Sequence, residues 1–180
     1  GDGPTDVADV FSTYLYTGNA GVNAINNGID LAGEGGLIWL KGRDASSSHT
    51  LHDTERGVNS RLAAQNTNAA QTSGLTSFNS NGFTLSATQA GELTNASNAE
   101  YASFTFRKKE KFFDVVTWTG NDVSGRTIAH GLDGPVGMII AKRTNASQDW
   151  VVWHKDLAST KYLKLNSTAA EATSTTIWTS

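Results

Sequence analysis

The chain has 180 residues, enough for one domain or two small ones. Its formal net charge of −3 and its pI near 5.8 argue against binding to the phosphate backbone of nucleic acids, which requires a basic face. Cysteine is absent, which excludes disulfides and thiolate metal sites, and no apolar run approaches the roughly 18 residues of a membrane-spanning helix.

The composition predicts an all-β protein. Hydrophobic residues make up 38 % of the chain and can form a core, whereas charged residues make up only 17 %. The polar surface must therefore consist largely of Ser, Thr, Asn and Gly. Thr and aromatic residues favour strands, and Asn and Gly favour turns, so many short strands are expected.

Apolar residues in the first part of the chain alternate with a period of two, which is typical of half-buried strands. In the segment 100–106, for example, Ala102, Phe104 and Phe106 share one face. The segment 77–86 predicts a hairpin, because its Asn-Ser-Asn-Gly turn readily adopts positive φ. The strands predicted here lie near residues 12–17, 22–27, 36–41, 48–53, 59–63, 74–78, 82–86 and 100–107.

The later part of the chain predicts a similar series, with no amphipathic helix of useful length in the whole sequence. Its strands are expected near residues 112–119, 126–130, 136–142, 148–154, 160–166 and 174–179. Short strands separated by turn signals at this spacing indicate a β-sandwich.

The two series repeat each other. TYLYTGN (13–19) returns as VVTWTGN (115–121), and GGLIWLK (35–41) returns as VGMIIAK (136–142). Leu62 stands opposite Leu163 in the same alignment, and the gaps fall in Gly- and Ser-rich stretches. A period of about 100 residues exceeds that of solenoid repeats and matches a whole small domain.

The sequence therefore predicts tandem antiparallel β-sandwich modules, jelly-roll or lectin-like, over residues 1–110 and 111–180. The second copy stops before it reaches a match for residues 74–107, so it is incomplete. A sandwich without its last strands leaves an open edge and an uncovered apolar face. We expect either a longer polypeptide or a neighbouring chain to supply those strands.

Several motifs resemble, in the same order, those of a β-rich domain that recurs in tail-fibre-like and other virion structural proteins of cyanophages and other marine phages. They are DVFSTYLYTGN, NGIDLAGEGGLIWLK, HDTERGV, GLTSFNSNGFTL, VVTWTGN, RTIAHGL, GMIIAKRT and WHKDL. The resemblance covers about residues 9–178 and implies a structural component of a phage particle. It supplies no catalytic residues.

The segment HTLHDTERG (49–57) is the densest group of reactive side chains. His49, His52, Asp53, Glu55 and Arg56 could form an acid–base pair or a metal site. The alternative is a strand entering a turn, where Asp53 or Thr54 accepts backbone N–H bonds and Arg56 pairs with a carboxylate. The second copy drops the Glu and Arg, which favours this structural interpretation.

Two further kinds of site are compatible with the sequence, a glycan-hydrolysing site and a sugar-binding site. The carboxylates Glu34, Asp44, Glu55 and Glu92 lie in predicted loops, and a glycan depolymerase would need two such groups to converge in a cleft. Trp150 and Trp153 are the candidate binding residues, since flat aromatic faces stack on sugars and the two side chains project from opposite faces of a strand. Packing against a neighbouring module is the alternative role for either one.

The function expected is that of a non-enzymatic virion protein, a tail fibre or appendage component for host-surface attachment, without catalytic residues, metal or cofactor. Its partners would be other copies of itself, as a homotrimer by family analogy, other virion proteins and a host-surface glycan, with no nucleic acid and no membrane insertion. The alternatives are a capsid or tail decoration protein, a lectin module and a depolymerase. The loops expected to present contacts are Gly42–Ser48, Ala87–Asn98 and Thr144–Gln148.

Overall fold

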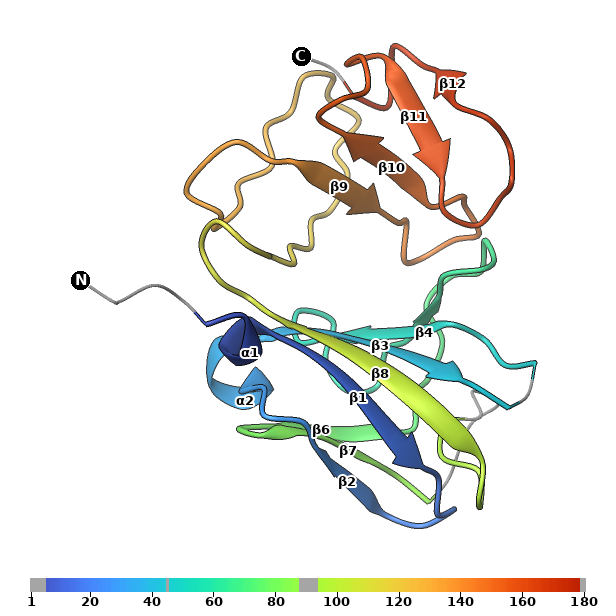
Figure 1. Ribbon diagram of the computed structural model, residues 1–180. Helices are drawn as coiled ribbons and strands as arrows, with labels where there is room; N and C mark the ends of the chain where they lie inside the picture. Colours follow the sequence, from blue (N-terminus) through green and yellow to red (C-terminus); the bar gives the residue numbers. More distant parts are fainter. Residues whose placement is uncertain (1–5, 45, 88–93, 179–180) are drawn as a thin grey trace.

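The computed structural model describes residues 6–44, 46–87 and 94–178, and these residues form an almost entirely β structure (Figure 1). Two one-turn helices, α1 (Val7–Val10) and α2 (Leu31–Glu34), begin at the capping side chains of Asp6 and Asp30. The strands are β1 (Phe11–Thr17), β2 (Asn23–Asn26), β3 (Gly36–Gly42), β4 (Thr50–Asp53), β5 (Leu62–Ala63), β6 (Leu75–Asn79), β7 (Gly82–Leu85), β8 (Glu100–Arg107), β9 (Met138–Ala141), β10 (Val151–His154), β11 (Lys161–Lys164) and β12 (Ala172–Thr173).

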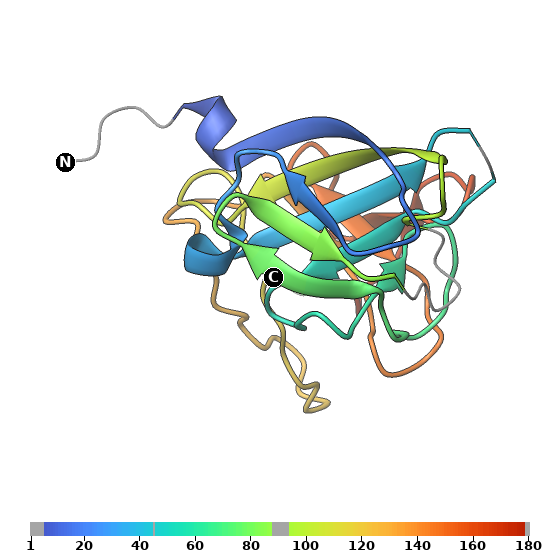
Figure 2. The same cartoon turned by 90° about the horizontal axis from the view of Figure 1, so that it is seen from below.

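The first eight strands form a β-sandwich, which we call the first module. One sheet has the order β1-β8-β3-β4-β5, and the other has the order β2-β7-β6. Figure 2 shows the smaller sheet lying across the larger one. All pairings are antiparallel, as predicted.

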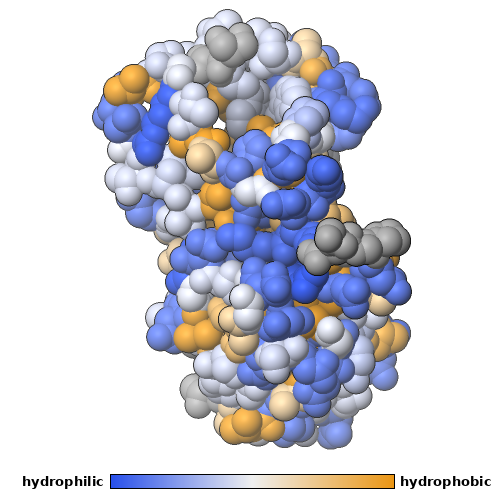
Figure 3. All heavy atoms as spheres, turned by 90° about the vertical axis from the view of Figure 1, so that its left-hand side faces the viewer, coloured by the Kyte–Doolittle hydropathy of each residue, from blue (hydrophilic) through white to orange (hydrophobic). Residues whose placement is uncertain are grey.

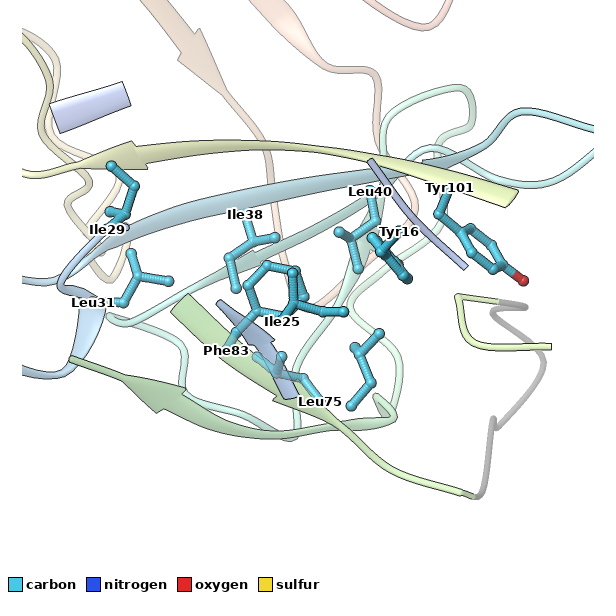
Figure 4. Close-up of a cluster of buried hydrophobic side chains, with 10 residues drawn as sticks. Tyr16, Ile25, Ile29, Leu31, Ile38, Leu40, Leu75, Phe83 and Tyr101 are labelled. Carbon is cyan, nitrogen blue, oxygen red and sulfur yellow. The ribbon is translucent and has the colours of Figure 1, made fainter. Parts of the chain in front are cut away.

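The core of the first module lies between these two sheets (Figure 4). Phe83, Ile38 and Leu40 are fully buried there, and Tyr16 stacks on Tyr101 with ring centroids 5.1 Å apart. Alternate residues of β3 are buried, so this strand sends Ile38 and Leu40 inward and Leu37 and Trp39 to the outer face of the sheet. The predicted hairpin is confirmed as β6 and β7, with Gly82 at a φ of +134°.

Residues 111–178, which we call the second module, contain one sheet of order β12-β11-β10-β9. This sheet lies beyond the outer face of the larger sheet of the first module, and Figure 3 shows two lobes joined at a narrower waist. Within the described chain, no strand is paired with this sheet on the outer side of β9. The second module is thus a sheet without the facing sheet of a sandwich.

The repeat seen in the sequence is present in the strand pairing. Leu37 pairs with Asp53 between β3 and β4, and Met138 pairs with His154 between β9 and β10, 101 residues later in each case (138 − 37 and 154 − 53). The same shift relates Leu51–Leu62 to Val152–Leu163, and Arg61–Gln71 to Tyr162–Ala172.

The 101-residue shift also relates hydrogen bonds that lie outside the strand pairs. The N–H of His49 donates to the side-chain oxygen of Gln65, and that of Trp150 donates to the side-chain oxygen of Asn166. A four-segment antiparallel unit, β3-β4-β5 with the bridge at Gln71, is therefore reproduced as β9 to β12. Equal registers over four segments are the structural signature of a duplicated unit.

The strand predictions are confirmed for all eight strands of the first module and for β9, β10 and β11. They are wrong at 112–119 and 126–130, which form no strand, and at 174–178, because the last strand of the described residues lies at Ala172–Thr173. Residue 179 of the last predicted strand lies outside the described residues. The reason at 112–119 is a missing partner: its counterpart β1 pairs with β8 alone, and no described strand pairs with segment 112–119. The two short helices were not predicted.

Candidate functional site at the junction of the modules

The polar cluster at residues 49–57 serves the fold of the first module. Asp53 accepts the backbone N–H of Arg56 at 2.9 Å and its Nε at 2.6 Å, and both side chains are buried. The guanidinium also donates to the carbonyl of Leu51 and to Ser60. Thr54 accepts the N–H of Gly36. The structural interpretation of this segment is confirmed, because Asp53 and Thr54 accept backbone N–H bonds and Arg56 pairs with the carboxylate of Asp53.

His52 points from β4 into the sandwich and is fully buried. Its Nδ1 lies 3.0 Å from the hydroxyl of Ser73, which also accepts the N–H of Leu75. Burial, reinforced by the nearby positive charges of Arg56 and Arg61, lowers the pKa of His52 to about 3. An imidazole with that pKa is a weak base and lies out of reach of a substrate, so the Ser–His pair anchors the segment before β6.

The predicted carboxylates do not converge. Glu34 lies 4.0 Å from Arg107, and Asp44 accepts the N–H of Glu100. Glu55 binds Lys108 at 2.8 Å, an ion pair that raises the pKa of the lysine. Glu92 lies outside the described residues. Among those that are described, no three His, Asp or Glu side chains are grouped to hold a metal ion.

Trp150 is not a surface residue, which corrects its assignment as an exposed binding platform. It is 4 % exposed and packs on Leu51, Leu62 and Ala64 of the first module. Its indole N–H donates to the carbonyl of Ala63 at 3.1 Å. This indole covers Leu51 on the outer face of the larger sheet, which explains why Leu51 is buried although its side chain points away from the smaller sheet.

The second candidate platform, Trp153, is only partly exposed, and its role in binding stays a prediction. It is half-buried, and its indole N–H is enclosed without a hydrogen-bond partner among the described residues. Trp118, in contrast, is 48 % exposed and was not selected from the sequence. The signal was available, because Trp118 is the repeat counterpart of Tyr16. Tyr16 is buried against Tyr101 of β8 and Phe83 of β7, two strands that have no counterpart among the described residues of the second module.

The loop Thr144–Gln148 binds the first module and is not a freely presented loop. The carbonyl of Thr144 accepts the N–H of Ala70 at 2.7 Å, and the N–H of Gln148 donates to the carbonyl of Thr67 at 2.8 Å. The hydroxyl of Ser147 donates to that of Thr67. These contacts fix the β9–β10 connection on the first module.

The other two loops make structural contacts where they are described. In Gly42–Ser48, the Ser47 hydroxyl accepts the N–H of Gly42, and residue 45 lies outside the described residues. In Ala87–Asn98, residues 88–93 lie outside the described part, and Asn95 is fully buried and bonds to Asn19 and Gly21.

The segment that joins β8 to the second module is held in place by a small group of charged side chains. Lys108 lies 3.3 Å from Asp114, and Asp114 also accepts the N–H of Gly131 at 2.7 Å. Burial by itself would raise the pKa of Asp114, but the Gly131 N–H and the ammonium group of Lys108 outweigh it and lower the pKa. The segment between β8 and the second module is therefore held in a defined conformation at the junction.

The arrangement is suited to rigid coupling of two β units, with a buried tryptophan as the central contact. The described part of the chain contains no helix that is long and apolar enough to cross a membrane.

A family model, described as domain of unknown function DUF7483, matches residues 6–180, and the chain belongs to that family. The matched residues thus span both the first and the second module. No curated protein and no solved structure matches the chain.

Proposed function

We propose that this DUF7483 protein is a non-enzymatic structural component of a phage virion, a tail fibre or appendage protein that takes part in attachment to the host surface. The observation that carries the proposal is the docking of one copy of a duplicated β unit on the other through Trp150. Stacked β modules with buried contacts resist bending and proteolysis, and both properties suit an exposed fibre. The phage setting comes from the motif resemblance alone.

The contacts of the reactive side chains support a mechanical role for the protein. The Asp53–Arg56 pair closes a turn, and His52 is buried in the sandwich. Glu34, Asp44 and Glu55 each pair with a different partner. An enzyme would need at least some of these groups to face a common cleft.

The decisive experiment locates the chain in purified phage particles. Antibodies against the chain, imaged by immunogold electron microscopy, are expected to label the tail or its appendages. Labelling confined to the capsid would support the alternative of a decoration protein, and absence of the chain from the particles would refute the proposal. Light scattering of the purified chain would test the homotrimer expected by family analogy.

Two biochemical assays address the remaining alternatives. Release of reducing sugar from host polysaccharide would refute the non-enzymatic role and favour a depolymerase. Binding to a glycan array would favour a lectin module. Trp118→Ala is the informative variant in that assay, because Trp118 is the exposed tryptophan, whereas replacing Trp150 would disturb the junction.

A further inference from the structure

The two copies of the duplicated unit differ at one edge. In the first module, the outer side of β3 pairs with β8, with Leu37 opposite Phe106 and Trp39 opposite Phe104. The counterparts of Leu37 and Trp39 are Met138 and Ile140 in β9, and no described strand pairs with them on that side.

Backbone groups are available at this edge. The N–H of Lys155 donates to the carbonyl of Gly137 at 2.9 Å, which directs the polar groups of Gly137 toward β10. Because direction alternates along a strand, the N–H and C=O groups of Met138 and Ile140 point to the opposite side. They have no backbone partner among the residues that the structure describes. An edge of this kind is a template for a further strand.

The apolar side chains near this open edge are exposed as well. Met138 is 52 % exposed and Ile140 is 42 % exposed. Trp118 is 48 % exposed, whereas its counterpart Tyr16 is 9 % exposed, because Tyr16 is covered by Tyr101 of β8 and Phe83 of β7. Segment 113–119, the counterpart of β1, forms no strand. All of these differences lie where β8 pairs in the first module and where no described strand pairs in the second.

We propose that the open edge of β9 is a docking site for a β-strand of a partner polypeptide that has the side-chain pattern of β8. That pattern places Phe104 and Phe106 on one face, and Tyr101, Ser103 and Thr105 on the other. The partner strand runs antiparallel to β9, with its Phe104 equivalent opposite Ile140 and its Tyr101 equivalent against Trp118. It converts segment 113–119 into a strand, as β8 pairs with β1 in the first module.

This assignment rests on an interface already present in the molecule. The equivalent edge of the first module carries β8 along seven residue pairs, from Gly36–Arg107 to Gly42–Tyr101. Recognition by strand addition combines main-chain hydrogen bonds with side-chain contacts at alternate positions. The inference goes beyond the proposed function, because it concerns the second module wherever the protein acts.

The test uses the full chain and a synthetic peptide with the sequence of Glu100–Arg107, EYASFTFR. Because the chain has no cysteine, Ala141→Cys introduces a single thiol, next to the expected position of the Ser103 equivalent. A peptide with Ser103→Cys is mixed with this variant in a glutathione redox buffer. We expect a mixed disulfide at a yield at least about tenfold above that of a scrambled peptide, a ratio that corresponds to about 1.4 kcal/mol.

Three controls define the register and the site. A peptide with its cysteine moved by one position places the thiol on the opposite face and should react less. Ala158→Cys, in an exposed turn, measures non-specific reaction. With the unsubstituted chain, the unmodified peptide should slow amide exchange at Met138 and Ile140 and shield the Trp118 indole, whose NMR signal is identified with Trp118→Phe.

Equal disulfide yields for the EYASFTFR-derived and scrambled peptides would overturn the proposal. So would peptide-induced protection confined to the first module, which would indicate exchange with β8 itself. A dimer paired β9 to β9 that the peptide cannot displace would assign the edge to a second copy of this chain and would also overturn it. Each of these results leaves the location of the protein in a virion untouched.

Discussion

The substitution Trp150→Ala measures the strength of the contact between the modules. Removing a tryptophan that is 4 % exposed leaves a cavity above Leu51 and Leu62, and Trp→Ala changes at such positions cost about 3–5 kcal/mol. Loss of the 3.1 Å hydrogen bond to Ala63 contributes about 1 kcal/mol of that total. We expect the free energy of unfolding to fall by about 3–5 kcal/mol.

The assay is urea denaturation followed by circular dichroism, with Trp118→Ala as the matched control. Trp118 is 48 % exposed, so its removal should change the stability by no more than about 0.5 kcal/mol. In Trp150→Ala the modules should also separate, so the connection at residues 142–149 should become sensitive to protease. Equal losses for the two variants, or a loss below about 1 kcal/mol for Trp150→Ala, would refute the central role of this indole.

Three further predictions concern the first module. Arg56→Ala leaves the carboxylate of Asp53 buried without its partner and should cost about 3–5 kcal/mol in urea denaturation, and a cost below about 1 kcal/mol would contradict the account of this pair. The pKa of His52 is lowered to about 3, so the folded state holds the imidazole neutral. The neutral imidazole contributes fully to the free energy of unfolding above about pH 6.5, and this contribution falls by about 1.4 kcal/mol per pH unit on acidification toward pH 3. At pH 5 the free energy of unfolding should therefore be about 2 kcal/mol lower. His52→Gln should flatten that part of a stability–pH curve, and an unchanged slope would argue against a buried neutral imidazole. Gly82→Ala places a Cβ 2.0 Å from a carbonyl oxygen of β2 and should strongly lower the melting temperature. Gly57 also has a positive φ, but a Cβ there meets open space, so Gly57→Ala should lower the melting temperature far less and cost about 1–2 kcal/mol of stability.

The sequence by itself determined the strands of the first module and the duplication. Alternating apolar residues in the segments that form β3 and β8 are a local signal, because neighbouring side chains of a strand point to opposite faces. The turn at Gly82 is local as well, since glycine tolerates positive φ. The repeat could be read directly, because two copies of a unit keep the residues that define the same register.

The local residue pattern did not predict the strands correctly where a strand depends on a partner that is distant in the sequence. Segment 113–119 is the repeat counterpart of β1 and is likewise rich in aromatic and β-branched residues, yet it forms no strand, because β1 is stabilised by hydrogen bonds to β8 and not by its own residues alone. The last strand, at Ala172–Thr173, was misplaced for a related reason: its position follows from pairing with Lys161 and Tyr162.

Only the tertiary structure decided the roles of the tryptophans. The alternation of side chains along residues 150–153 predicts Trp150 and Trp153 on opposite faces, but it does not reveal what each face meets. Trp150 is buried because the second module docks on the outer face of the first, and Trp118 is exposed because strands like β7 and β8 do not cover it. Burial depends on contacts between residues about 100 positions apart in the chain, and a pattern that spans only a few residues carries no information about them.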